Sequence, residues 1–244
     1  MMFLSKSSLG KVVRAQVRFK MTAYMGAVLS LIVVQLVGLI ISLNGTGSMG
    51  TSIDNISIQV NIVTHDGVFM FVAIWALFVG NLITTKAYRY DDFSFVTTRL
   101  SGNIANIIIL CMVSVFAGVT TFLSNYLLRV VLLLFGSSSY LKSPGILENP
   151  LSSYLNVMVI IILILTAASA GYFGGMLLQK SKVFMVLIPA FIIAIPVTKS
   201  GQAFLAYVFM ENESMLFLLV KLVSITIILF ALAIVTSNRL EVRA

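Results

Sequence analysis

The sequence predicts an all-α polytopic membrane protein, with six transmembrane helices in a single transmembrane domain that covers residues 1–244. Three observations support this fold class. Of the 244 residues, 59% are hydrophobic and only 10% are charged, whereas a soluble domain has about 45–50% apolar and about 25% charged residues. The mean hydropathy is +1.07. The apolar residues also fall in long runs, and because one helical crossing takes roughly 20 residues, there is room for about six spans.

The first 20 residues predict a basic amphipathic helix that lies on the membrane surface. They carry five basic residues and no acidic one: Lys6, Lys11, Arg14, Arg18 and Lys20. Apolar residues alternate with these charges at mixed spacing, which is typical of an interfacial helix. The apolar run that follows is longer than the hydrophobic region of a signal peptide and lacks a small-residue cleavage site. We therefore predict a retained first span at 21–43.

A polar loop separates this span from the second, which we predict at 62–83. The next apolar run, 104–135, is 32 residues long and would measure about 48 Å as a helix. This is too long for a hydrocarbon core of about 30 Å and too short for two crossings with a turn. We predict a third span at 104–124, followed by an interfacial extension that carries Asn125 and Arg129.

The last three spans are predicted at 154–178, 183–198 and 214–236. The apolar stretch 202–210 is too short to cross the membrane alone. We therefore predict that Lys199 to Glu213 forms a re-entrant hairpin in the outer leaflet, where protein or trapped water would satisfy its polar groups.

The fifth span contains two prolines, Pro189 and Pro196, which are seven residues apart on one helix face. Each removes an intrahelical hydrogen bond. They are candidate gating kinks, although harmless kinks are common in membrane helices.

The basic residues indicate how the chain is oriented in the membrane. Twelve of the 16 Lys and Arg residues fall on the side of the N-terminus, and four fall on the other side. The positive-inside rule then predicts a multi-pass protein with both termini in the cytoplasm. Since these residues lie at the ends of apolar runs rather than in one patch, the net charge of +8 does not indicate a nucleic-acid partner.

Few residues could support catalysis or bind a metal. The chain has one cysteine, Cys111, and one histidine, His65, so neither an internal disulfide nor a thiolate metal cluster can form. No hydrolase, zinc-protease or nucleotide-binding motif is present. His65 and Asp66 form a polar cap at the outer end of the second span or an ionisable contact at membrane depth. We predict that the chain is not an enzyme and holds no cofactor.

The longest charged connection, 84–103, is the strongest candidate for a docking surface. It joins two acidic residues to two aromatic residues and an arginine: Asp91, Asp92, Phe93, Phe95 and Arg99. The acidic pair suits the start of a short helix, which would expose the aromatic residues and the arginine. Such side chains are typical of protein-docking sites, but aromatic residues also anchor chains at the headgroup level without any partner.

Two further patterns have alternative interpretations. Gly171 and Gly175 have the small-xxx-small spacing that permits close helix approach, and Ala23 and Ala27 repeat it. Both pairs predict packing within the chain or, less simply, a dimer seam. Lys221 lies about two turns inside the last span, where it would reach the outer interface by snorkelling or contact a substrate.

The segments AYRYDDFSFVTTRLSGNIANIIIL (87–110) and AGYFGGMLLQKSKVFMVLIPA (170–190), together with this architecture, resemble permease subunits of type-2 (exporter) ABC transporters, in particular small six-span permeases of Gram-positive bacteria. The resemblance implies a bacterial cell-membrane protein that pairs with a second permease copy or a paralogue. A separate cytoplasmic ABC ATPase would bind ATP and Mg²⁺. It would receive Asp91 to Arg99 as a coupling helix, with the helix that carries Lys11, Arg14 and Arg18 lying beside it.

The resemblance also implies an activity: export by alternating access, driven by ATP hydrolysis in the partner. The mostly apolar spans favour an amphipathic or hydrophobic substrate such as a peptide, an antibiotic or a lipid-like molecule. Other functions stay open at this point. The chain could be a substrate-capture subunit for small-molecule uptake, or a scaffold or sensor that transports nothing. An intramembrane enzyme would need acidic and histidine clusters that the spans lack.

Overall fold

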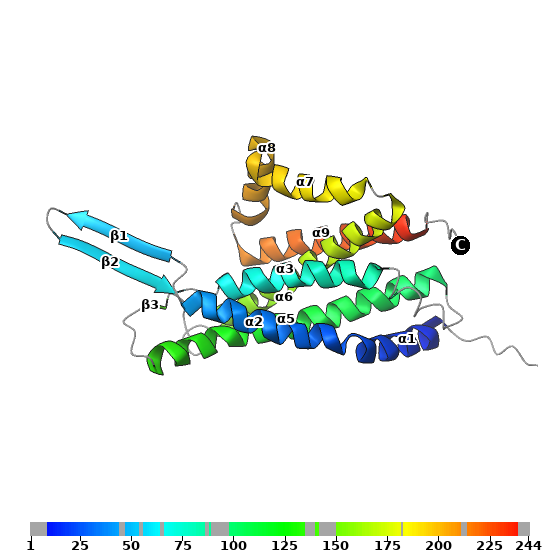
Figure 1. Ribbon diagram of the computed structural model, residues 1–244, viewed down its shortest axis with the longest axis horizontal. Coiled ribbons are helices and arrows are strands. Elements are labelled where there is room, and N and C mark those ends of the chain that lie inside the picture. The colour runs from blue at the N-terminus through cyan, green and yellow to red at the C-terminus, as the bar shows by residue number, and fades with distance from the viewer. Residues whose placement is uncertain are drawn as a thin grey trace, which may run out of the picture.

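A computed structural model of the protein describes residues 9–43, 47–53, 56–63, 66–85, 88, 98–134, 140–141, 150–181, 183–210 and 214–238. Five helices are long and apolar enough to cross a membrane: α2 (Met25–Leu43), α3 (Asp66–Thr84), α5 (Arg99–Leu134), α6 (Pro150–Lys180) and α9 (Met215–Asn238). They form a bundle along the long axis of the molecule (Figure 1). The number rises to six if the bent segment before α9 is one span. The prediction of a helical protein compatible with a membrane is confirmed.

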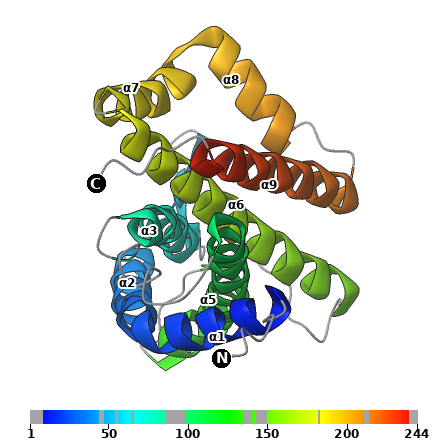
Figure 2. The same cartoon turned by 90° about the vertical axis from the view of Figure 1, so that its right-hand side faces the viewer.

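The basic N-terminal segment forms a helix of its own, α1 (Leu9–Ala23). It is separated from α2 at Tyr24, so the first apolar helix starts at Met25 rather than at residue 21. Figure 2 looks along the bundle and shows α1 running across its end, whereas α2 is seen nearly end-on. We call this end of the bundle the α1 end.

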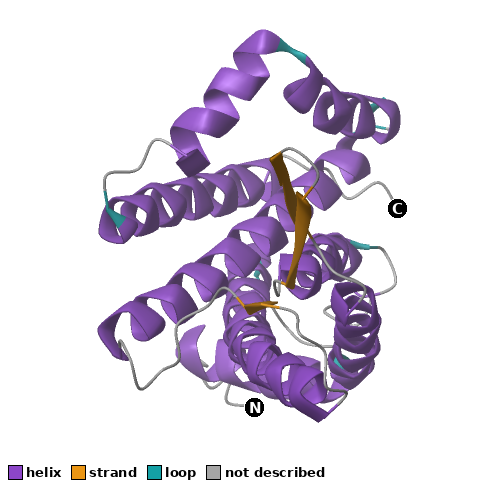
Figure 3. Cartoon of the chain, turned by 90° about the vertical axis from the view of Figure 1, so that its left-hand side faces the viewer, coloured by secondary structure: helices purple, strands orange, loops and turns teal. Residues whose placement is uncertain are grey.

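A β-hairpin replaces the polar loop that the sequence predicted before the second span. Strand β1 (Gly47–Ile53) pairs antiparallel with β2 (Ile56–Val63), and β2 pairs in parallel with the short β3 (Tyr140–Leu141). In residues 56–62 isoleucine or valine alternates with a polar residue, which is the period of a strand. The second apolar helix therefore begins at Asp66 and not at residue 62. The hairpin projects from the end opposite α1 (Figures 1 and 3), which we call the hairpin end.

The third apolar run is a single helix of 36 residues, α5. Its length of about 54 Å exceeds a hydrocarbon core of about 30 Å. The predicted extension beyond Ser124 continues the same helix without a break, because no proline or glycine interrupts it there. Ser124 and Asn125 are both buried.

Helix α6 lies at the centre of the bundle, between α3 and α5 on one side and α9 on the other (Figure 2). Its contact with α3 is a glycine seam. A Cβ on Gly171 would lie 2.0 Å from the carbonyl oxygen of Leu77, and one on Gly80 would lie 2.1 Å from that of Ala168. The spacing of Gly171 and Gly175 thus serves packing within the chain. Pro150 begins α6 four residues before the predicted start, which suits proline because the first helical position needs no N–H.

Side-chain hydrogen bonds join neighbouring helices within the apolar bundle. The Gln35 amide of α2 donates to Thr120 Oγ1 of α5 at 2.8 Å. The hydroxyl groups of Thr166 in α6 and Thr226 in α9 lie 2.8 Å apart. Such polar contacts hold helices together where lipid removes the hydrophobic driving force.

The segment before α9 consists of α7 (Phe184–Val197), α8 (Lys199–Leu205) and the π-helix η1 (Ala206–Met210). The chain bends by 82° between α7 and α8, at the break that the sequence predicted near residue 198. Thr198 caps α8 by accepting from the backbone N–H of Gly201 at 3.3 Å. Helix α7 continues through Pro189, and Pro196 lies in its last turn.

Candidate functional site: the α1 end of the bundle

The α1 end gathers most of the described basic residues. Six belong to α1, to the start of α5 or to the end of α6: Lys11, Arg14, Arg18, Lys20, Arg99 and Lys180. Three lie nearer the hairpin end, on α5, α8 and α9: Arg129, Lys199 and Lys221. Lys11, Arg14 and Arg18 are exposed and share one face of α1. The opposite face is buried and packs against α5.

A buried polar network, which we call the polar junction, joins three helices at this end. The Lys20 amine of α1 donates to Asn106 Oδ1 of α5. Asn106 Nδ2 donates to the Tyr172 hydroxyl of α6 at 3.3 Å, and that hydroxyl donates to Asn103 Oδ1 at 2.9 Å. All four side chains are at most 5% exposed. A buried charge is costly unless it is hydrogen-bonded, so the junction fixes the position of α1.

Gln16 lies one turn before Lys20 on the same buried face of α1. It is fully buried, and neither of its amide atoms has a hydrogen-bond partner among the residues that the structure describes. An unsatisfied buried amide destabilises the packed state by about 1–3 kcal/mol. The contact between α1 and α5 therefore contains the stabilising hydrogen bond of Lys20 to Asn106 and the unfavourable burial of Gln16.

The predicted docking connection is described only at its two ends. Asp91, Asp92, Phe93 and Phe95 lie outside the described residues. At its start, the Tyr88 ring packs against the Tyr24 ring, with centroids 5.0 Å apart and planes inclined at 55°. Tyr24 is the residue between α1 and α2, so the connection begins in contact with the joint of these helices.

At the other end of the connection, Arg99 contacts the last turn of α9. Its NH1 group donates to the carbonyl oxygens of Ser237 at 3.3 Å and Asn238 at 3.4 Å. A positive charge at a helix C-terminus is favourable because the last carbonyl groups carry partial negative charge. Arg99, predicted as part of a protein-docking surface, thus also joins α5 to α9.

The ends of α3 and α6 are joined as well. Gln179 Nε2 donates to the carbonyl oxygen of Thr84, and a Cβ on Gly175 would lie 2.0 Å from Thr84 Oγ1. Helices α1, α3, α5, α6 and α9 therefore have side-chain links to one another at the α1 end.

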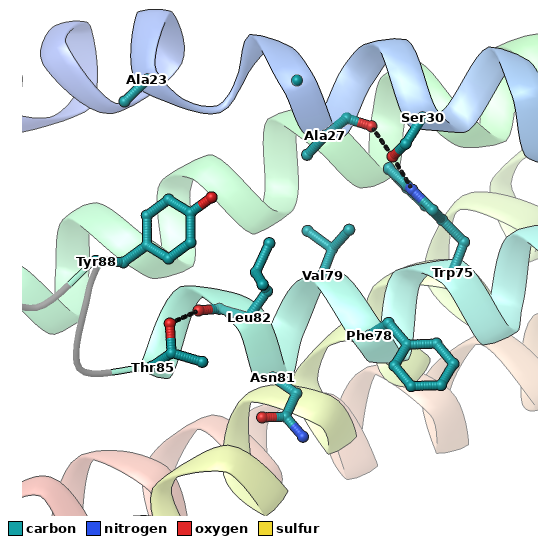
Figure 4. A pocket seen from close by; sticks show the side chains of 11 residues that line it. Ala23, Ala27, Ser30, Trp75, Phe78, Val79, Asn81, Leu82, Thr85 and Tyr88 are labelled. Atoms are coloured by element: carbon teal, nitrogen blue, oxygen red, sulfur yellow. Dashed lines mark hydrogen bonds between the residues drawn. The ribbon is translucent and has the colours of Figure 1, made fainter.

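A groove of about 430 Å³ lies between α2 and α3 on the side of the α1 end. Figure 4 shows its wall of small residues, including Ala23 and Ala27, facing Val79 and Leu82 of α3, with Tyr88 at one end. Trp75 lies at the other end, where its indole N–H donates to Ser30 Oγ at 2.9 Å. The small residues Ala23 and Ala27, predicted as a packing motif, thus line an open groove.

Lys221 takes part in a separate contact near the hairpin end. Its amine donates to the Tyr207 carbonyl oxygen at 2.8 Å and lies 4.0 Å from the centroid of the Tyr207 ring and 4.7 Å from that of Phe217. It therefore ties η1 to α9, a role that the snorkelling interpretation did not include.

Sequence reasoning missed Asn103, Asn106 and Tyr172. Asn103 lies just before the apolar run and Asn106 lies in its first turn, so the two asparagines, three residues apart, share a helix face, and polar residues inside spans usually face other helices. That spacing could have identified them. No local pattern identifies Lys20 as their partner.

No family model, curated protein or solved structure matches this chain. Among the described residues, no group of three or more His, Cys, Asp or Glu side chains is placed to hold a metal ion.

Proposed function

We propose that the chain is the membrane-spanning permease subunit of an ATP-driven exporter in the bacterial cell membrane. A separate cytoplasmic ABC ATPase would hold ATP and Mg²⁺, and a second permease copy or a paralogue would complete the translocation path. The resemblance of residues 87–110 and 170–190 to type-2 exporter permeases supports this proposal, and so do the five long apolar helices.

One observation carries the proposal. Both described ends of the predicted docking connection are attached to the helix bundle, at Tyr88 through Tyr24 and at Arg99 through the end of α9. Tyr24 lies four residues after Lys20. The polar junction links Lys20 to α5 and α6. A displacement of the connection by an ATPase would therefore act on several helices at once. A loop that only anchored the chain in lipid would need no such attachments.

The distribution of charge supports the orientation. Exposed basic residues of α1, such as Arg14 and Arg18, lie at the same end as Arg99 and Lys180. The positive-inside rule assigns this end to the cytoplasm, where an ATPase would be found. Helix α1 then lies at the inner membrane surface, with its basic face toward the lipid headgroups and its buried face on α5.

The proposed mechanism is alternating access. Closure of the ATPase on ATP would move the coupling helix and tilt the helices attached to it. The bend between α7 and α8, preceded by Pro189 and Pro196, provides a candidate gate at the hairpin end. The mostly apolar helices favour an amphipathic or hydrophobic substrate, such as a peptide, an antibiotic or a lipid-like molecule.

Co-purification with the ABC ATPase encoded in a neighbouring reading frame tests the proposal. We expect a stable complex from the wild-type chain and its loss with Phe93→Ala, because an aromatic anchor in an interface commonly contributes about 2 kcal/mol or more. The matched control is Phe209→Ala, which removes an exposed ring near the hairpin end. Failure of the wild-type chain to bind any ABC ATPase would contradict the proposal.

The orientation has a separate test, which the single cysteine makes simple. In a Cys111→Ser background, Ser94→Cys and Ser52→Cys place one thiol in the docking connection and one in β1. We expect a membrane-impermeant maleimide to label Ser52→Cys in intact cells, and Ser94→Cys only after permeabilisation. The reverse pattern would contradict the cytoplasmic assignment.

A further inference from the structure

Helix α1 packs on α5 through a face that is largely polar, and we call this arrangement the docked state. The buried residues of α1 are Val13, Gln16 and Lys20, and only the first of them is apolar. Two of its larger apolar side chains, Leu9 and Phe19, are 49% and 43% exposed. A helix on a protein surface usually turns its apolar stripe toward the core. Docking therefore buries polar groups of α1 while much of its apolar surface stays exposed.

The Gln16 amide opposes the docked state. The side chain is 0% exposed, and in the part of the chain that the structure describes neither its oxygen nor its nitrogen has a hydrogen-bond partner. Both atoms would be hydrated if α1 left α5. A buried donor or acceptor without a partner costs the desolvation penalty of that group, so this side chain favours separation of the two helices.

A hydrogen bond of Lys20 holds the contact closed and continues into the bundle. Lysine only donates, so Asn106 turns its Oδ1 to Lys20 and its Nδ2 to the Tyr172 hydroxyl. Tyr172 is fully buried, and the centroid of its ring lies 6.2 Å from that of Phe230 in α9. Loss of the Lys20 bond would free the Asn106 amide to turn. The position of α1 is therefore linked to the hydrogen bonds at the centre of the bundle.

The joint between α1 and α2 provides a hinge. Tyr24 separates the two helices, and its carbonyl oxygen accepts from the backbone N–H of Ala27 at 2.9 Å and of Val28 at 3.4 Å. The shorter bond spans three residues, as in a 3₁₀ turn, which often marks a hinge within a helical segment. A Cβ on the neighbouring Gly26 would meet no heavy atom within 4 Å. The joint therefore has open space on at least one side.

We propose that α1 is a releasable strap, which exchanges between the docked state and a released state in which Gln16 and Lys20 are hydrated. The hydrogen bond from Lys20 to Asn106 closes the strap, and the unpaired Gln16 amide opposes closure. Tyr24 is the hinge. The strap depends only on contacts within this chain, so it is independent of the exporter proposal.

A thiol on the docked face measures release. The native Cys111 is the single cysteine and is replaced by serine, and Val13→Cys then places a thiol on the buried face of α1. The full chain in lipid nanodiscs is treated with a water-soluble maleimide. Ala15→Cys, at an exposed position of α1, gives the rate of an accessible thiol, and Val72→Cys, at a position 0% exposed in α3, gives the rate set by global unfolding. We expect the rate of Val13→Cys to lie between these two.

Two further substitutions should shift this rate in opposite directions. Gln16→Leu removes the unpaired amide and should slow the labelling of Val13→Cys about tenfold. Thr22→Leu adds the same apolar side chain at an exposed position of α1 and should leave the rate unchanged. Asn106→Leu removes an acceptor of the Lys20 amine and should speed labelling about tenfold. The labelling of Val72→Cys, measured with each substitution, shows whether global unfolding contributes.

Labelling of Val13→Cys at the rate of Val72→Cys would overturn the proposal, because α1 would then leave α5 only when the whole chain unfolds. Labelling at the rate of Ala15→Cys would overturn it too, since α1 would not be docked. An unchanged or faster rate in Gln16→Leu would show that the buried amide does not oppose docking, and the strap would lose its basis.

Discussion

The Lys20 amine donates a hydrogen bond to Asn106 Oδ1 across 86 residues of sequence. Lys20 is only 2% exposed, and this neutral amide oxygen belongs to the network that Asn106 shares with Tyr172. Because Lys20 belongs to α1 and Asn106 to α5, the bond attaches the N-terminal helix to the long helix that begins at Arg99. Together with the packing of α1 on α5, this bond connects the basic surface helix to the bundle.

Removal of the acceptor at this contact should destabilise the protein. In Asn106→Leu the buried Lys20 amine loses one hydrogen-bond acceptor, and we expect a loss of about 1–3 kcal/mol in the free energy of unfolding. Thermal unfolding of the full chain in detergent measures this. The double variant Lys20→Met/Asn106→Leu should recover much of the loss, because replacing both polar groups with apolar ones removes the buried charge together with the acceptor.

The control for this cycle is Arg14→Met, which removes an exposed charge from the same helix and should change stability by less than about 0.5 kcal/mol. If the double variant lost as much free energy of unfolding as Lys20→Met and Asn106→Leu together, the two side chains would not interact. That result would contradict the polar junction.

The apolar runs predict where the long helices lie because a crossing needs about 20 apolar residues, but α5 and α6 extend beyond the predicted spans. The end of the first span at Leu43 and the bend near Thr198 agree with the structure. The polar composition before the second span predicted a loop, whereas the alternation of isoleucine or valine with polar residues in 56–62 has the period of the strand observed there.

The contacts at the α1 end were much harder to predict. Lys20 appears in the sequence as one more topology-determining charge before an apolar run. Its burial depends on how α1 crosses the bundle end and meets Asn106, and no local propensity encodes that long-range packing. Arg99 was identified as a site residue, but its bonds to the end of α9 also depend on tertiary structure.

The glycine seam between α3 and α6 gives a prediction with a neighbouring control. Gly171→Ala would place a Cβ 2.0 Å from the Leu77 carbonyl oxygen, so the helices must separate. We expect a severe loss of monodisperse protein on size-exclusion chromatography. Gly174→Ala, whose Cβ meets nothing closer than 3.8 Å, should be tolerated and should gain up to about 1 kcal/mol in helix propensity. Equal behaviour of the two variants would contradict the packing of α3 against α6.

Pro189 tests the proposed gate. Proline lacks an N–H group, so Pro189→Ala can restore one hydrogen bond inside α7 and should stiffen the helix. If bending at this point is part of the transport cycle, we expect a higher unfolding midpoint together with slower ATP turnover by the complex with its ATPase in proteoliposomes. Pro150→Ala is the control, because at the first turn of α6 the missing N–H costs little. Unchanged turnover in Pro189→Ala would exclude Pro189 as a gating kink.

Lys221 should hold the segment of α8 and η1 against α9. Its amine contacts the Tyr207 carbonyl oxygen and lies over the rings of Tyr207 and Phe217, and cation–π contacts contribute about 0.5–2 kcal/mol each. We therefore expect Lys221→Met to raise the rate of amide hydrogen exchange in residues 199–210 without changing exchange in α3 or α6. Lys221→Arg keeps the charge over the rings and should stay close to the wild type. Lys199→Met removes an exposed charge from α8 itself and controls for the general loss of a cation. If Lys221→Met and Lys199→Met had the same small effect, the contact of Lys221 with η1 would not stabilise the bend, and Lys221 would be left with the simpler role of reaching the membrane interface.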